Sequence, residues 1–293
     1  MNKQTIFSLE YLPLLIRLKA KETARLPAFL GSTLHGVVGW TLAQHSPESY
    51  AYVFENRRLG GATQDIVNPY IIEPPRPKSV YFAGDSLCFR LILLGDAVRY
   101  AQHIVSAFVQ VHQFGIGAER KPFELIDILQ GNQYGSIWQG GKMDIEAATL
   151  ENISAFAQQD QAFWCSTQFL TPVRIRRGGA LVQEINVPTI IRSITRRVQT
   201  LTERYGGHIN EATSIQACEL ASEIQLGSSA LFLNQMHRYS SRKKDSVDWS
   251  GMLGALNFEG ELTPLTPWLN AARILHIGRN STFGCGQIEA IYR

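Results

Sequence analysis

The order of strand-like and helix-like segments constrains the fold most, because a similar order occurs in both halves of the chain. In the first half, apolar patterning predicts helices from Pro27 to His45 and from Gly95 to Phe114. Extended segments are predicted at 11–19, near 70–72, at 86–94 and at 122–128. Strand, helix, two strands, helix and strand is the order of a ferredoxin-like unit.

The second half repeats this order of elements without repeating the residues themselves. Pro188 and the pair Gly206-Gly207 bracket a helix over 188–205. The other predicted elements are a strand at 161–173, strands or a strand–helix mixture over 213–226, 229–239 and 250–258, a helix at 264–275 and a last strand at 287–292. The sequence therefore predicts an α+β protein with two tandem ferredoxin-like (RRM-like) domains, 1–140 and 155–293, joined through the Gln/Gly/Asn-rich segment that begins at 130.

The composition is that of an ordinary globular protein and gives no sign of a membrane or secreted one. The 293 residues carry a net charge of only +3 and are 45% hydrophobic, which is ordinary for a globular chain of about two domains. No run of about 18 apolar residues predicts a membrane span, and the N-terminus lacks the pattern of a secretory signal peptide. The four cysteines form no CxxC pair. We therefore expect a soluble, cytoplasmic protein with free thiols and no membrane partner.

Basic residues are concentrated in two places of the second half. Between 174 and 204 there are seven arginines and two glutamates, and a second basic cluster runs from His237 to Lys244. Guanidinium groups bind phosphate bidentately, and interleaved aromatic rings can stack on bases, so both clusters predict RNA contacts. The alternative is a solvated helix face and a polar loop. The candidate residues are Arg174, Arg176, Arg177, Arg192, Arg196, Arg197, Arg238, Arg242, Lys243 and Lys244.

A glycine-rich loop at 278–286 separates the last predicted helix from the last strand. It contains Gly278, Arg279, Gly284 and Gly286. Glycine allows close approach of a ligand and exposes backbone N–H groups, so these four residues are candidates for binding RNA phosphates. A plain tight turn is the alternative. The loop lacks the GK[ST] ending of a nucleotide-binding P-loop, which excludes an NTPase of that type.

This loop is one of several motifs that, in order over roughly 30–290, resemble the CRISPR-associated repeat-processing endoribonucleases of the RAMP superfamily. The other motifs are Gly31-Ser-Thr-Leu-His-Gly36, Asn68–Pro75, Gly84-Asp85, Leu93-Leu-Gly95, Phe114-Gly-Ile-Gly117, Leu170-Thr-Pro-Val-Arg174, Arg238–Lys244 and Gly251-Met-Leu-Gly254. The resemblance implies tandem ferredoxin-like domains and binding of CRISPR repeat RNA. It also implies cleavage without metal or cofactor that leaves a 2′,3′-cyclic phosphate and a 5′-hydroxyl.

Such cleavage uses the 2′-hydroxyl of the RNA as nucleophile and needs a base, an acid and positive charge at the phosphate. Histidine suits the acid or base role because its ordinary pKa is about 6.5. Members of the family often carry a catalytic histidine at or just beyond the first helix, which favours His45. His35 lies inside that helix and is the second candidate, with RNA contact or packing as alternatives. His103 and His112 are expected to be surface or packing residues.

Metal chemistry is not supported, because no HxH, HExxH or clustered acidic pattern has ligand spacing. Three functions remain. The first is an endoribonuclease that cleaves CRISPR precursor RNA within the repeat and stays bound to the guide RNA. The second is a non-catalytic RNA-binding subunit of a CRISPR effector complex, which makes other subunits its partners. The third is a structural protein whose arginines bind another protein.

Overall fold

The computed structural model describes residues 5–55, 67–131, 134–156, 161–240 and 245–293. These residues form two compact units. The N-terminal unit comprises Leu9–Asn152 and Glu203–Gly207, and the C-terminal unit comprises Met1–Ser8, Ile153–Thr202 and His208–Arg293. Two features of this division were not predicted from the sequence. The described residues that precede Leu9 belong to the C-terminal unit, and a short segment around residue 205 belongs to the N-terminal one.

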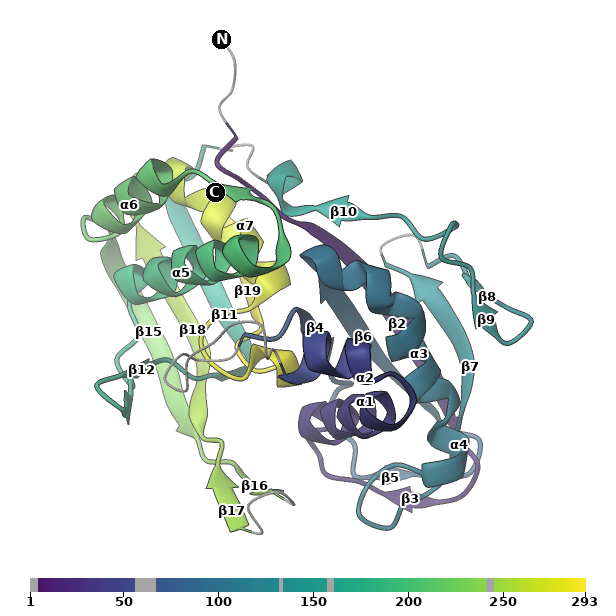
Figure 1. Cartoon of the computed structure of the whole chain (residues 1–293). Helices are drawn as coiled ribbons and strands as arrows, with labels where there is room; N and C mark the ends of the chain where they lie inside the picture. Colours follow the sequence, from purple (N-terminus) through teal and green to yellow (C-terminus); the bar gives the residue numbers. More distant parts are fainter. Residues whose placement is uncertain (1–4, 56–66, 132–133, 157–160, 241–244) are drawn as a thin grey trace. The chain divides into compact units, whose positions relative to one another are not determined.

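The N-terminal unit is built on an antiparallel sheet (Figure 1). Its strands are β2 (Glu10–Ala20), β4 (Tyr70–Glu73), β6 (Ser86–Leu94), β7 (Phe123–Gln130) and the short β10 (Glu151–Asn152). β6 lies between β4 and β2, while β7 pairs with the other edge of β2, and β10 pairs with the beginning of β2. The resulting order β4-β6-β2-β7 is that of a ferredoxin-like sheet and confirms the predicted topology.

Helices of this unit pack on the sheet through apolar side chains. They are α1 (Gly31–His45), α2 (Pro47–Ser49), the π-helical turn η1 (Tyr50–Glu55), the 3₁₀ helix η3 (Gly95–Tyr100), α3 (Ala101–Val109) and α4 (Val111–Phe114). Ile104 and Phe108 of α3 are fully buried, and the Phe108 ring lies 5.0 Å from that of Phe89 in β6. Burying each such side chain contributes about 1.5–3 kcal/mol.

Two predicted helices of the N-terminal unit differ from the structure. α1 begins at Gly31 rather than Pro27, because the first intrahelical hydrogen bond runs from Leu34 N–H to Leu30 C=O, and Leu26 N–H is bonded to Ser79 C=O. The single helix expected over 95–114 is divided into η3, α3 and α4.

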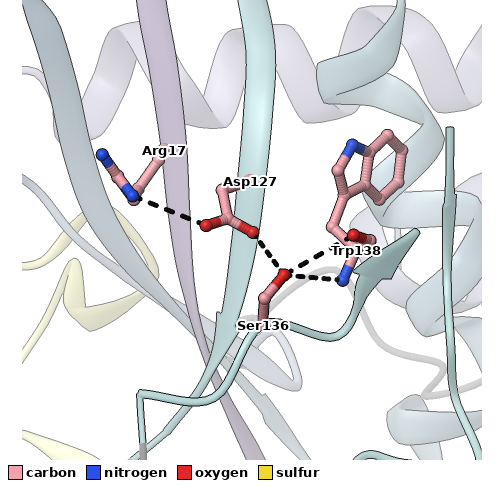
Figure 2. A network of polar contacts seen from close by, with 4 residues as sticks. All are labelled: Arg17, Asp127, Ser136 and Trp138. Atoms are coloured by element: carbon pink, nitrogen blue, oxygen red, sulfur yellow. Dashed lines mark hydrogen bonds and ion pairs between the residues drawn. The ribbon is translucent and has the colours of Figure 1, made fainter. Parts of the chain in front are cut away.

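Two small ribbons complete the N-terminal unit: β3 (Ala24–Arg25) with β5 (Val80–Tyr81), and β8 (Trp138–Gln139) with β9 (Lys142–Met143). A polar network fastens the second ribbon to the main sheet (Figure 2). Arg17 of β2 and Asp127 of β7, which face each other in the strand register, form an ion pair of 3.5 Å. The Ser136 hydroxyl donates to Asp127 over 2.7 Å and accepts from Trp138 N–H.

The C-terminal unit contains a second antiparallel sheet with the same topology. Its strands are β11 (Trp164–Val173), β15 (Gln225–Asn234), β18 (Gly251–Glu259) and β19 (Ile288–Tyr292). Their order, β15-β18-β11-β19, is again ferredoxin-like. Alternate residues of β11, such as Cys165, Thr167 and Phe169, are buried, whereas Gln168 and Leu170 are exposed. The predicted α+β fold with two tandem ferredoxin-like domains is therefore confirmed.

Three helices accompany this sheet: α5 (Val187–Tyr205), α6 (Glu211–Leu220) and α7 (Thr266–Leu275). For 213–226 and 229–239 the sequence predicts either strands or a strand–helix mixture, and the structure contains the mixture, with α6 followed by β15. Asn210 begins α6, because its side-chain oxygen accepts hydrogen bonds from Ala212 N–H and Thr213 N–H. Three short ribbons belong to the same unit: β1 (Phe7–Ser8) with β14 (His208–Ile209), β12 (Arg176–Arg177) with β13 (Ala180–Leu181), and β16 (His237–Ser240) with β17 (Asp245–Asp248).

Candidate active site

His45, the first catalytic candidate, is the last residue of α1, and its side chain is exposed. The helix stops there because the backbone of Ser46 leaves the helical conformation (φ −150°, ψ 77°), and Pro47 follows. Ser46 N–H donates to Leu42 C=O over 2.9 Å and so satisfies one of the last carbonyls of the helix. The geometry leaves the imidazole of His45 accessible to a large substrate such as RNA.

His35, the second candidate, lies in the middle of α1 and is half-buried. Its ring stacks on Phe54 at 4.4 Å and on Tyr70 at 5.9 Å between centroids. Tyr50 extends the stack, with its ring 5.1 Å from that of Phe54. His35 Nδ1 lies 2.8 Å from the hydroxyl of Tyr70. These contacts support the packing role that the sequence left open for this residue.

A third histidine contacts the residue that follows His45 in the chain. His103 of α3 is exposed, and its Nδ1 lies 2.5 Å from Ser49 Oγ and 3.3 Å from Ser46 Oγ. Ser46 directly follows His45 in the chain. The sequence predicts a surface or packing residue at His103, and no spacing in it links His103 to a position more than fifty residues away.

The glycine-rich loop of the C-terminal unit folds back onto the end of β11. Gly278 N–H donates to Ser193 Oγ over 2.9 Å, Gly286 N–H to Pro172 C=O over 3.0 Å, and Gly284 N–H to the carbonyl of Ser281 over 2.8 Å. The N–H groups of all three glycines are thus used within the chain. This geometry favours the tight-turn alternative over a loop whose glycine amides point at phosphate.

Close backbone packing explains why two of these positions are glycine. A Cβ at Gly278 would lie 2.6 Å from Arg174 C=O, and one at Gly286 would lie 1.8 Å from Ile277 C=O. Gly278, Gly284 and Gly286 all have positive φ, at 76°, 85° and 76°, which is costly for other residues. Arg279, by contrast, presents an exposed side chain while its N–H donates to Arg174 C=O.

Two residues of this region, His276 just before the loop and Cys285 inside it, are buried. His276 is buried, and its Nδ1 lies 3.1 Å from Cys285 C=O, so it connects the residue before the loop to the end of the loop. Cys285 is also buried, and burial raises the pKa of its thiol to about 12. A thiol with that pKa stays protonated at neutral pH, so Cys285 is a poor nucleophile.

The arginine candidates divide into buried and exposed residues. Arg174 donates to the carbonyls of Ser250 and Asp248, the latter over 3.0 Å, and Arg197 Nε donates to Leu275 C=O over 2.5 Å. Both are buried, so their guanidinium groups bind backbone carbonyls inside the C-terminal unit, before β18 and at the end of α7, rather than lying on its surface. This burial differs from the surface position that a direct phosphate contact requires.

The exposed candidates are Arg176 and Arg177 in the β12–β13 ribbon and Arg192 and Arg196 on one face of α5. Arg192 and Arg196 lie one turn of helix apart on α5. The side chains of all four arginines are exposed, whereas Arg174 and Arg197 are held by buried contacts. Arg238 belongs to β16, in register with Val247 of β17. Arg242, Lys243 and Lys244 lie outside the described residues.

Within the described ranges, no group of three or more His, Cys, Asp or Glu side chains is placed to hold a metal ion. No helix in the same part of the chain is long and apolar enough to cross a membrane.

Comparison with known proteins adds two family-model matches. Residues 9–150 match AF_1859_N, described as an N-terminal domain, and residues 167–288 match the family described as CRISPR-associated endoribonuclease Cas6. An uncharacterized protein of Archaeoglobus fulgidus is 23% identical over 295 residues, which cover 93% of this chain and 96% of that protein.

Solved structures share the fold. A Cas6 product complex of Thermus thermophilus is similar with a TM-score of 0.64 at 14% identity, over 96% of this chain and 99% of that one. A protein in a partial Cas6-RT-Cas1–Cas2 complex is similar with a TM-score of 0.65 at 11% identity, over 97% of this chain and 46% of that one. At such identities the likeness shows the fold alone.

Proposed function

We propose that the chain is a CRISPR-associated repeat-processing endoribonuclease, which cleaves CRISPR precursor RNA within the repeat, without a metal ion, to give guide RNAs. The observation that carries this proposal is the match of residues 167–288 to the Cas6 endoribonuclease family. The product-bound Thermus structure of the same fold supports it, since that protein was captured with the product of its reaction.

The proposed chemistry is transesterification by the RNA itself. A base removes the proton of the 2′-hydroxyl, the 2′-oxygen bonds to phosphorus, and the bond from phosphorus to the 5′-oxygen breaks. An acid protonates the departing 5′-oxygen, so the products carry a 2′,3′-cyclic phosphate and a 5′-hydroxyl. His45 is the first candidate for one of these proton transfers, because its imidazole is exposed at the end of α1.

RNA binding is assigned to exposed cations of the C-terminal unit. Arg176, Arg177, Arg192, Arg196 and Arg279 have the surface positions that phosphate contacts need. Arg238, Arg242, Lys243 and Lys244 remain expected contacts from their sequence. We also expect other CRISPR-associated proteins among the partners, as in the complex that contains a similar Cas6 domain.

The test is incubation of the protein with repeat RNA from its own CRISPR locus in the presence of EDTA, followed by mass spectrometry of the product ends. We expect one cut within the repeat, a cyclic phosphate on the upstream fragment and a 5′-hydroxyl on the downstream one. Binding without cleavage would identify a non-catalytic RNA-binding subunit. Cleavage that occurs only with added Mg²⁺ would contradict the metal-independent mechanism.

A further inference from the structure

A seam within the N-terminal unit brings together side chains that the sequence separates by about fifty residues. On one side are Ser46, α2 and η1, which continue the chain directly after His45. On the other side are η3 and α3. The π-helical turn η1 is notable here, because π-helical turns occur frequently at functional sites.

The imidazole of His103 is held at this seam by two hydroxyls. Ser49 Oγ lies 2.5 Å and Ser46 Oγ 3.3 Å from Nδ1, and the two hydroxyls are 2.7 Å apart. Ser49 is fully buried, whereas His103 is exposed, so Nδ1 is anchored at the exposed edge of the seam. Nε2 then remains as the nitrogen available for proton transfer.

Serine hydroxyls suit a proton-transferring histidine in a specific way. A hydroxyl can donate to Nδ1 or accept from it, so Ser49 can satisfy Nδ1 in the neutral and in the protonated imidazole. A carboxylate partner would favour the protonated form, and a backbone N–H would favour the neutral one. The two serine hydroxyls are therefore compatible with both the neutral and the protonated imidazole, and an acid or base must pass through both forms.

A cation lies one helical turn before His103. The guanidinium carbon of Arg99 is 4.6 Å from the ring centre of Tyr52 and 4.9 Å from that of Tyr100. Both tyrosines are buried, while Arg99 is exposed. Tyr100 is itself fixed, because its hydroxyl donates to Glu48 over 3.1 Å. Stacking holds the plane of the guanidinium and leaves its N–H edge available for a phosphate.

We propose that this seam is the part of the cleavage site that binds and reacts at the scissile phosphate. This inference rests on the function proposed above. His103 is a second catalytic residue, which makes one of the two proton transfers while His45 makes the other, and Arg99 binds the phosphate oxygens. Two histidines supply both the acid and the base, whereas His45 alone supplies only one of the two.

The two transfers balance the reaction. One imidazole accepts the proton of the 2′-hydroxyl, and the oxygen–phosphorus bond forms with that electron pair. The pair of the breaking phosphorus–oxygen bond moves to the 5′-oxygen, which takes a proton from the other, protonated imidazole. The charge on the phosphate oxygens is largest between these events, and a fixed guanidinium is most effective at that point.

The first experiment measures single-turnover cleavage of repeat RNA and RNA affinity for His103→Ala, His103→Gln and, as a control, His112→Ala. His112 is also exposed in this unit, and its Nδ1 is already bonded to Val109 C=O. We expect both His103 variants to lose about 10²–10⁴-fold in rate with unchanged affinity and melting temperature, and the control to match the wild type. Rates within threefold of wild type for the two His103 variants would overturn the proposal.

A second substrate separates a catalytic role from a structural one. In RNA with sulfur in place of the 5′-oxygen at the scissile bond, the leaving group needs no protonation. We expect this substrate to restore the rate of only one of the variants His45→Ala and His103→Ala, namely the one that lacks the acid. Restoration of both or of neither would contradict the two-histidine assignment.

Arg99→Ala tests the phosphate contact, with the exposed Arg25→Ala as its control. We expect Arg99→Ala to lower the single-turnover rate about 10²-fold and Arg25→Ala to leave it unchanged. Equal rates for the two variants would remove Arg99 from the site. Absence of cleavage by the wild type would instead contradict the proposed function, so the two failures are distinguishable.

Discussion

The hydroxyl of the fully buried Tyr70 lies 2.8 Å from Nδ1 of His35 and joins strand β4 to helix α1. Burial raises the pKa of Tyr70, so its hydroxyl stays neutral at physiological pH and available for this bond. We expect Tyr70→Phe to lower the free energy of unfolding by about 0.5–1.5 kcal/mol, measured by urea denaturation.

The contacts of His35 with Tyr70 and Phe54 predict the effect of replacing His35. Replacing it by alanine removes the middle of the ring stack with Phe54 and Tyr70, so stability falls further than in Tyr70→Phe. We expect the cleavage rate of folded His35→Ala to stay within tenfold of wild type. A stable His35→Ala protein that binds RNA but does not cut it would make His35 catalytic instead.

His45→Ala should lower the single-turnover rate about 10²–10⁴-fold while the RNA affinity is retained. The reason is its exposed imidazole at the end of α1, the position where the family often carries its catalytic histidine. Gln44→Ala is the matched control, because Gln44 is the exposed neighbour on the same helix. Wild-type cleavage by His45→Ala would move the catalytic role elsewhere.

The double variant Arg192→Ala/Arg196→Ala should weaken RNA binding and flatten its salt dependence. For single-stranded RNA the slope of log K against log salt falls by about 0.7 per lost phosphate contact. Arg273→Ala is the control from the same unit, since Arg273 is already paired with Glu289. An unchanged slope in the double variant would show that the exposed face of α5 does not contact RNA.

Gly286→Ala should destabilise the C-terminal unit. A residue other than glycine at this positive φ costs on the order of 1–3 kcal/mol, and its Cβ would also clash with Ile277 C=O. Gly36→Ala is the control, because Gly36 lies in α1 with open space around it, and alanine there should stabilise by up to about 1 kcal/mol. A Gly286→Ala protein that melts like wild type but loses RNA affinity would restore the phosphate-binding interpretation of the loop.

The sequence predicted best the elements whose patterning is dictated by burial. The strand predicted at 86–94 is observed at Ser86–Leu94, because its apolar run is buried in the middle of a sheet. Helix α6 is different. Of its residues only Ala217 is buried, and Ile215 is exposed, so no apolar stripe marks it as a helix. Asn210 was the local signal that could have identified its beginning.

The site was harder to predict because its geometry depends on contacts between distant residues. Glycine spacing at 278–286 shows that the backbone bends, but not that its amides bond to β11 and to the loop itself. Arginine clustering likewise does not separate Arg197, which is buried, from Arg196 beside it, which is exposed. The approach of His103 to Ser46 and Ser49 exists only in the folded unit.

In the proposed mechanism the 2′-hydroxyl of the RNA itself is the nucleophile. The most direct test compares single-turnover cleavage of two repeat RNAs in EDTA, one all-ribose and one with a single 2′-deoxy nucleotide immediately upstream of the scissile phosphate. We expect equal binding of both RNAs and cleavage of the all-ribose RNA only, with a 2′,3′-cyclic phosphate. Cleavage of the 2′-deoxy RNA at the same bond would contradict it, because that substrate has no hydroxyl to form the cyclic phosphate.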